Sequence, residues 1–410
     1  MQTFAYLLFY LIAAGNILFG MARKRSRFLY IGAFFVIFAL MTFYSSGPDI
    51  GVYMAEYNTI GNYDNPMSAT YMEWGYTLVT LVCSKSGLNF FAFRAVLTVV
   101  AMSLFASSIR YYRAQGNLII GFYMLYLFFF DTIQIRNFFV QFIILFGTRY
   151  LLQKGKLASL KYIVCVALAA GFHSIAWVYL SLILVRMLRK QRFYKYLFTI
   201  VILQFLVFVV FHPMLPRISS LLASLGDRAS GYLSGSIKIG WFVVLTLYLL
   251  GLFALYFFKN GVCDKRVRCM IDNILKINII LGLFLPLTFF NNNFNRIFRN
   301  GIILTQIGIA LIYTHSPRSS KASQAAACSL VLINVGWIYS DIFARYDVAQ
   351  IITPIFESNL LLNGTASSDL PQYVLAVLVC LVLLKAIKVI FARKKRASIP
   401  RNLVRGGAKC

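Results

Sequence analysis

The sequence has little negative charge, few histidines and none of the common nucleotide- or metal-binding motifs. Of its 410 residues, 12 are Asp or Glu and three are His, against 40 Lys or Arg. It contains no Walker P-loop, dinucleotide fingerprint, His-Glu-x-x-His or Gly-x-Ser-x-Gly motif, which argues against the enzyme classes that use them. The seven cysteines fit neither a disulfide framework nor a zinc site, so we expect no metal and no cofactor.

What the sequence has in abundance is apolar residues. Hydrophobic residues make up 60% of the chain, charged residues 13%, and the mean hydropathy is +0.75, values typical of a membrane protein. The net charge of +28 would suggest nucleic acid in a soluble protein. Here the bases form short clusters between apolar runs, so we expect the lipid bilayer, and no nucleic acid, as a partner. The first 20 residues lack the features of a removable leader and are expected to be a permanent span.

Apolar segments predict an all-α polytopic integral membrane protein. About thirteen segments are long enough, or nearly so, to cross a hydrocarbon layer of roughly 30 Å, and several are short or broken. They fall at about 3–21, 28–45, 89–109, 117–131, 133–152, 157–172, 174–189, 196–212, 240–258, 271–290, 300–314, 324–340 and 372–391. We therefore expect a single transmembrane domain over residues 1–392, a basic cytoplasmic tail over 393–410, and no soluble domain.

The basic clusters predict the orientation of the chain. Short loops rich in Lys and Arg stay on the cytoplasmic side, which places the N-terminus outside and the C-terminus inside. Three larger loops, at about 45–88, 213–239 and 341–371, then lie outside. Basic clusters flank the stretch 157–189 on both sides, so it must cross twice, as two short helices that meet in an outward-facing break at residues 170–174. Any chemistry is expected at the outer face or within the membrane.

Two acidic residues of the first outer loop are candidate catalytic groups. Asp49 and Glu73 each abut a membrane segment and lie among Gly and Tyr residues. A carboxylate there can act as a general base or bind sugar hydroxyls, with the rings of Tyr53 and Tyr76 stacking on sugar faces. The alternative for the rings is an interfacial aromatic belt.

Four arginines are candidate ligands for an anionic substrate. Arg94 and Arg136 lie at the predicted outer ends of spans, where charge is costly and often functional. Arg296 and Arg299 are three residues apart in a polar turn, so both can face one site on a helix that begins there. Arginine binds diphosphate well because its donors are fixed in a bidentate array. The alternatives are an ion pair between Arg136 and Asp131, and membrane anchoring by the later arginines.

His173 lies in the predicted outward-facing break between the two short helices. A histidine there can act as a base or hold substrate. The alternative is a satisfied core histidine, because a single His without a partner defined by spacing is a weak signal.

The spacing of these residues resembles that of the EpsG-like, Wzy-type bacterial polysaccharide polymerases. The landmarks are Asp49 with Tyr53, Glu73-Trp-Gly-Tyr76, Arg136-Asn137, the Lys-Gly-Lys turn at 154–156, Ala-Ala-Gly-Phe-His173-Ser, and Asn295-Arg296. The resemblance covers about residues 40–190, with a looser match at 290–310. It implies a GT-C-like membrane glycosyltransferase that joins oligosaccharide repeat units carried on undecaprenyl diphosphate, at the outer face of the bacterial plasma (inner) membrane.

The resemblance also implies roles and partners. Asp49 and Glu73 would be the acidic groups, Arg136 and Arg296 the diphosphate contacts, and His173 a base or substrate ligand. A chain-length regulator and a flippase of the same pathway would be partner proteins, and the product would be O-antigen (lipopolysaccharide), capsule or exopolysaccharide.

Three other functions are alternatives. A flippase for lipid-linked oligosaccharide would draw on internal repeats and midplane charges, and neither is found. A polysaccharide ligase would use nearly the same outer-face chemistry. A structural scaffold would leave the outward arginines unexplained.

Overall fold

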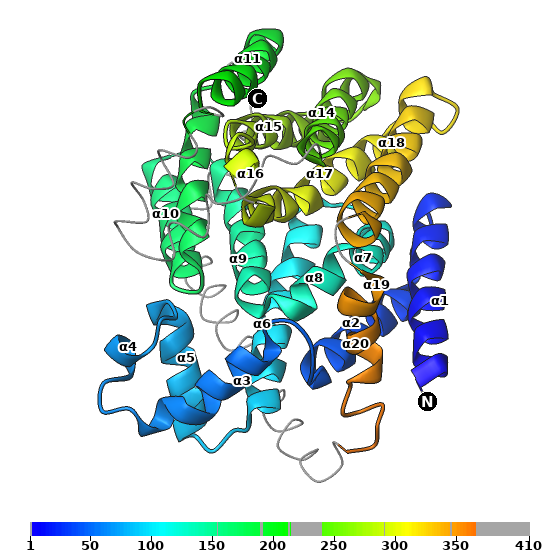
Figure 1. Ribbon diagram of the computed structural model, residues 1–410. Helices are drawn as coiled ribbons and strands as arrows, with labels where there is room; N and C mark the ends of the chain where they lie inside the picture. Colours follow the sequence, from blue (N-terminus) through cyan, green and yellow to red (C-terminus); the bar gives the residue numbers. More distant parts are fainter. Residues whose placement is uncertain are drawn as a thin grey trace, which may run out of the picture.

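The computed structural model describes residues 2–153, 155–188, 192–211, 214, 240–290, 292–344 and 347–365, and these ranges contain helices and no strand (Figure 1). An isolated antiparallel bridge joins Tyr44 to Asn359. Most of the predicted loop 213–239, the predicted span 372–391 and the tail 393–410 lie outside the described residues.

The described residues form the following helices. In chain order they are α1 (Gln2–Met21), α2 (Arg27–Phe43), α3 (Ile50–Thr59), η1 (Ile60–Asn62), α4 (Pro66–Ala69), α5 (Trp74–Lys85), α6 (Phe90–Tyr112), α7 (Gly116–Leu125), α8 (Leu127–Ile133), α9 (Ile135–Leu151), α10 (Lys156–Ala170), η2 (Ser174–Arg186), α11 (Phe193–Phe211), α14 (Gly240–Phe258), η4 (Lys259–Gly261), α15 (Lys265–Gly282), α16 (Leu287–Phe290), η5 (Asn292–Phe294), α17 (Asn295–His315), α18 (Lys321–Trp337), η6 (Ile338–Phe343), α19 (Val348–Ile351) and α20 (Thr353–Glu357).

Five helical segments of the described chain are long and apolar enough to cross a membrane. They are Gln2–Met21, Phe90–Tyr112, Phe242–Gly261, Asn295–His315 and Lys321–Phe343. Several shorter apolar helices accompany them, which agrees with a polytopic helical membrane protein. The count of about thirteen spans stays a prediction.

Two predicted spans differ in detail from the helices observed. The segment 117–131 is not one straight helix, because α7 and α8 meet at an angle of 61° next to Tyr126. The segment 271–290 begins earlier, at Lys265, and ends at Gly282. Its earlier start follows from Asp264, whose side chain accepts from the backbone N–H groups of Arg266 and Val267 and so caps the helix.

The predicted break at residues 170–174 is confirmed. The α-helix α10 ends at Ala170, and the 3₁₀ helix η2 begins at Ser174. His173 precedes η2 in an extended conformation, so its side chain projects from the break rather than from the side of a helix. That the break faces outward stays a prediction.

Helix α17 is the most deeply buried of the five long helices, because 83% of its apolar stretch lies inside the protein. It packs against α9, α14, α15 and α18 (Figure 1). Gly308 permits the close approach of α14 and α15, since a Cβ atom there would lie 2.5 Å from Leu255 and 3.0 Å from Ile274. A rigid central helix therefore begins at Asn295, next to Arg296.

The predicted outer loop 45–88 is largely helical. It folds into α3, η1, α4 and α5, which form a group at one end of the molecule beside α6 (Figure 1). Tyr57 fixes this group, because its hydroxyl donates to the carbonyl oxygen of Leu88 at 2.7 Å and its ring packs against Phe90 and Phe93. Asp49 and Glu73, at the starts of α3 and α5, are thus held on folded structure.

Candidate functional site

A polar cavity of about 560 Å³ lies where the helices of the loop 45–88 meet the starts of α9, η2 and α17. Its lining consists of Asp49, Val52, Tyr53, Tyr71, Glu73, Arg136, His173, Ser174 and Arg296. A second cavity, of about 380 Å³ between α2 and α6, is lined by apolar and hydroxyl side chains and has no charged residue. The polar cavity is therefore the candidate site.

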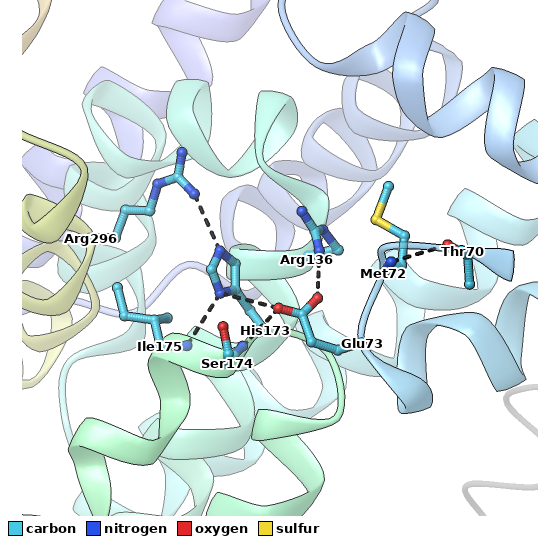
Figure 2. Close-up of polar contacts among 8 residues, drawn as sticks. All are labelled: Thr70, Met72, Glu73, Arg136, His173, Ser174, Ile175 and Arg296. Atoms are coloured by element: carbon cyan, nitrogen blue, oxygen red, sulfur yellow. Dashed lines mark hydrogen bonds and ion pairs between the residues drawn. The ribbon is translucent and has the colours of Figure 1, made fainter. Parts of the chain in front are cut away.

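Glu73 is the centre of the polar contacts in this cavity (Figure 2). Its Oε2 accepts from Arg136 Nη1 at 2.5 Å, and its Oε1 accepts from the backbone N–H of Ser174 at 2.9 Å. The same Oε1 lies 3.7 Å from His173 Nδ1. On the far side of the imidazole, Arg296 Nη1 lies 3.3 Å from His173 Nε2. Four predicted site residues, from four separate parts of the chain, thus form one continuous series of polar contacts.

The local structure explains why Glu73 reaches His173. Glu73 is the residue that precedes α5, and its side chain makes no capping bond to that helix. The backbone N–H of Tyr76 instead donates to the carbonyl oxygen of Gly171 at 2.9 Å. This contact joins the start of α5 directly to the break before η2, so Glu73 lies against Ser174.

Arg136 lies in the first turn of α9, between the Glu73 carboxylate and two tyrosine rings. Its guanidinium carbon is 5.7 Å from the centre of the Tyr53 ring and 6.0 Å from that of Tyr76, within the range of a cation–π contact. Both tyrosines are buried, but Tyr53, with 6% of its surface exposed, lines the cavity, whereas Tyr76, with 1% exposed, lies behind it. Tyr76 therefore supports Arg136 rather than facing the cavity.

Glu73 and His173 differ in their charge state at neutral pH. Burial, together with the nearby Arg136 and Arg296, lowers the pKa of His173 to about 4 in spite of the Glu73 carboxylate. Burial alone would raise the pKa of Glu73, but Arg136 and the Ser174 N–H outweigh it, and the pKa lies below its ordinary value. Glu73 is therefore ionised and His173 neutral.

The neutral imidazole faces an N–H donor at each ring nitrogen. The backbone N–H of Ile175 is 3.3 Å from Nδ1, and Arg296 lies beside Nε2. A neutral ring accepts at one nitrogen only, so the two donors compete. When the ring accepts from Arg296, its proton is on Nδ1, the nitrogen nearer the Glu73 carboxylate.

Asp49 lies at the exposed rim of the cavity. Its backbone adopts the left-handed conformation, with φ of 65°, which is uncommon for a residue other than glycine. Its side chain makes no capping bond to α3. The carboxylate is therefore available at the cavity entrance.

Two predicted arginines lie away from the cavity lining. Arg94 is buried and donates to the carbonyl oxygens of Tyr44, at 2.9 Å, and Thr132, at 3.2 Å. Arg299 donates to Gln134 Oε1 at 3.1 Å. Arg296 and Arg299 thus point to different surroundings, although their spacing allowed a shared site. A role for Arg94 or Arg299 in binding substrate stays a prediction.

The alternative pairing of Arg136 with Asp131 is wrong. The Asp131 carboxylate accepts from Tyr123 at 3.1 Å and from Gln141 at 3.0 Å, while Arg136 pairs with Glu73. The five-residue spacing placed both charges near one helix end, but the turn at Gln134 between α8 and α9 directs them apart.

Three further residues line the cavity that were not predicted from the sequence, namely Val52, Tyr71 and Ser174. Ser174 acts through its backbone N–H, so its side-chain type carries no signal. The glycines at 75 and 171 are a signal that was available, since they mark the close backbone contact described above. Within the described ranges, no group of three or more His, Cys, Asp or Glu side chains is placed to hold a metal ion.

Comparison with known proteins gives one match. The model of the EpsG family matches residues 27–340, which include every residue lining the polar cavity. No curated protein matches the chain, and neither does any solved structure.

Proposed function

The chain belongs to the EpsG family, which indicates a polysaccharide polymerase-like function, and we propose that it joins oligosaccharide repeat units carried on undecaprenyl diphosphate at the outer face of the plasma membrane. The observation that carries the proposal is the series Arg136, Glu73, His173 and Arg296 around one polar cavity. The arginines are suited to bind a diphosphate, and the carboxylate and imidazole are suited to bind or deprotonate a sugar hydroxyl.

In the proposed reaction the arginines act on the leaving group. Arg136 and Arg296 line the same cavity from α9 and α17. Charge-assisted, bidentate hydrogen bonds from guanidinium groups suit the oxygens of a diphosphate. They stabilise the negative charge that develops when the bond between the anomeric carbon and the diphosphate oxygen breaks.

His173 is the base in this proposal. Nε2 takes the proton of the acceptor hydroxyl, the acceptor oxygen bonds to the anomeric carbon, and the diphosphate departs with the bonding electron pair. Glu73 is close to Nδ1 and orients the ring with its proton on that nitrogen. Donor binding prepares the base, because the diphosphate draws Arg296 from Nε2 and offsets the positive charge that lowers the pKa of His173.

The sugars would occupy the rest of the cavity. Tyr71, with 49% of its surface exposed, offers a ring for stacking on a sugar face, and Asp49 at the rim offers a carboxylate for sugar hydroxyls. Tyr53 also lines the cavity but is largely buried against Arg136. Tyr76 supports Arg136 from behind.

The experiment that tests the proposal is the surface-glycan ladder of the native host. The gene is deleted and then complemented with wild type, with Arg136→Ala, or with the control Arg149→Ala at the other end of α9. We expect glycan of a single repeat unit after deletion, and long chains restored by wild type and Arg149→Ala but not by normally expressed Arg136→Ala. Long chains stranded on the lipid carrier would indicate a ligase instead. Unpolymerised units trapped at the inner leaflet would indicate a flippase.

A further inference from the structure

A buried pair of asparagines joins the two helices that carry the arginines of the cavity. Asn137 Nδ2 donates to Asn300 Oδ1 at 3.1 Å, and Asn300 Nδ2 donates to Asn137 Oδ1 at 3.2 Å. Asn137 directly follows Arg136 on α9, and Asn300 lies about one helical turn after Arg296 on α17. Both side chains are buried. The pair is therefore a buried polar contact between α9 and α17 beside the cavity, in addition to the hydrogen bond from Arg299 to Gln134 at the start of α9.

A buried tyrosine connects this asparagine pair to η2, the third helix that positions a residue of the site. Asn300 Nδ2 also donates to Tyr179 Oη at 2.9 Å, and that hydroxyl donates to the carbonyl oxygen of Ile297 at 3.1 Å. Tyr179 is fully buried on η2, the helix that begins directly after His173. The Asn137–Asn300–Tyr179 cluster thus links the three elements that position Arg136, Arg296 and His173.

The cavity needs such a link for an electrostatic reason. Arg136 and Arg296 line one small space, and their like charges repel before an anion arrives, although the Glu73 carboxylate beside Arg136 offsets part of this repulsion. Donors that bind a developing negative charge are most effective when they are fixed in advance. A reciprocal amide pair forms at one rotation and one depth of the two helices, whereas apolar side chains pack in many registers.

Resting on the proposed function, we propose that the Asn137–Asn300–Tyr179 cluster sets the spacing of Arg136 and Arg296 and thereby the affinity of the site for the donor diphosphate. Its members are positioning residues, because none of them lines the cavity. They act through the arginines and the histidine that share their helices.

The test measures the binding of undecaprenyl diphosphate to the purified full-length protein in lipid nanodiscs. Asn137→Leu and Asn300→Leu remove the amide at nearly constant shape and without adding charge. We expect each to weaken binding roughly tenfold or more, since small displacements of binding groups have large effects. Tyr179→Phe removes a single hydroxyl and is expected to weaken binding as well, but less strongly. It tests the inference even if the leucine variants fail to fold.

The matched control is Asn334→Leu. Asn334 is equally buried and accepts from Gln306 of α17 at 2.6 Å, but it lies on α18, which contributes no residue to the cavity. Asn334→Leu should lower the melting temperature, as Asn137→Leu and Asn300→Leu do, but leave the binding of undecaprenyl diphosphate unchanged. The double variant Asn137→Leu/Asn300→Leu should regain stability, because no buried amide is left without a partner, yet still bind weakly.

Two results would overturn the inference. If binding followed the melting temperature in all variants, Asn334→Leu and the double variant included, the cluster would be structural only, and the proposed function would stand. Wild-type affinity in the single leucine variants and in Tyr179→Phe would have the same meaning. If wild type itself did not bind undecaprenyl diphosphate, the proposed function would fail, and the inference with it.

Discussion

The backbone of Gly171 lies directly against the backbone of Gly75. A Cβ atom on Gly75 would be 2.8 Å from the carbonyl oxygen of Gly171, and a Cβ atom on Gly171 would be 2.9 Å from the Trp74 ring. Neither position has room for a side chain. Because Glu73 and His173 each lie two residues from one of these glycines, the contact sets the approach of the carboxylate to the imidazole.

Replacement of either glycine by alanine should abolish polymer formation. Gly75→Ala forces the start of α5 away from the backbone of Gly171, and Gly171→Ala displaces the ring of Trp74, the first residue of α5. Both changes are expected to separate Glu73 from Ser174 and His173. The measurement is the surface-glycan ladder of the complemented deletion strain, together with membrane expression. Gly51→Ala is the control, because Gly51 lies next to Val52 of the cavity lining and a Cβ atom there meets nothing within 4 Å. Long chains in a normally expressed Gly171→Ala strain would contradict this account.

Loss of the histidine should reduce the rate of glycosyl transfer more than the binding of donor. For His173→Gln we expect a fall in kcat of about 10²–10⁴, the usual contribution of a positioned base. Binding of undecaprenyl diphosphate should change little, because Arg136 and Arg296 remain. His315→Gln, at the end of α17, is the matched control and should have wild-type kcat. Equal losses in the two variants would show that His173 is not the base.

The pKa of His173 should rise when donor binds. In the free protein burial and the two arginines lower the pKa to about 4, and a bound diphosphate offsets their positive charge. Imidazole NMR titration in nanodiscs, with and without undecaprenyl diphosphate, measures this change, and the spectrum of His173→Gln assigns the signal among three histidines. An unchanged pKa of His173 at saturating undecaprenyl diphosphate would show that donor binding does not prepare the base.

Acid should destabilise the protein partly through His173. In the unfolded chain a histidine has a pKa of about 6.5, whereas the folded value is about 4, so between these values the unfolded state binds the extra proton. Stability should therefore fall as the pH decreases from about 6.5 towards 4. Glu73, whose pKa is also lowered, adds a loss of the same sign at lower pH. Melting temperatures across this range should fall less in His173→Gln than in wild type, and parallel curves would exclude the effect.

Arg94 should prove important for stability rather than for donor binding. Its guanidinium bridges the carbonyl oxygens of Tyr44 and Thr132, and a lysine ammonium does not reproduce that planar array. Arg94→Lys should lower the free energy of unfolding by about 1–3 kcal/mol by leaving a buried carbonyl without a donor. Binding of undecaprenyl diphosphate should remain as in wild type. A melting temperature that is unchanged while donor affinity drops would instead place Arg94 in the site.

Much of the site could be predicted because its residues violate the expectations for a membrane segment. Arg136 and His173 stand out as polar groups in apolar surroundings, and Glu73 and Asp49 as acids next to spans. Such groups are costly unless they have a partner or a function, so their identity alone carries a signal. The break at residues 170–174 was predicted for a related reason, since basic clusters on both sides require an even number of crossings.

The amino-acid sequence accounts for the helical and apolar character of the chain, for the break between one pair of helices, and for the charged residues that stand out. These properties follow from local composition and from the energetics of charge near lipid. The three-dimensional packing establishes that Arg136 pairs with Glu73 rather than Asp131, that Arg296 faces His173 while Arg299 turns to Gln134, and that Arg94 is buried. The choice of partner depends on how helices that are distant in sequence are rotated and how closely they approach. Side-chain contacts such as that of Asn137 with Asn300 set this geometry, and it cannot be read from residue spacing.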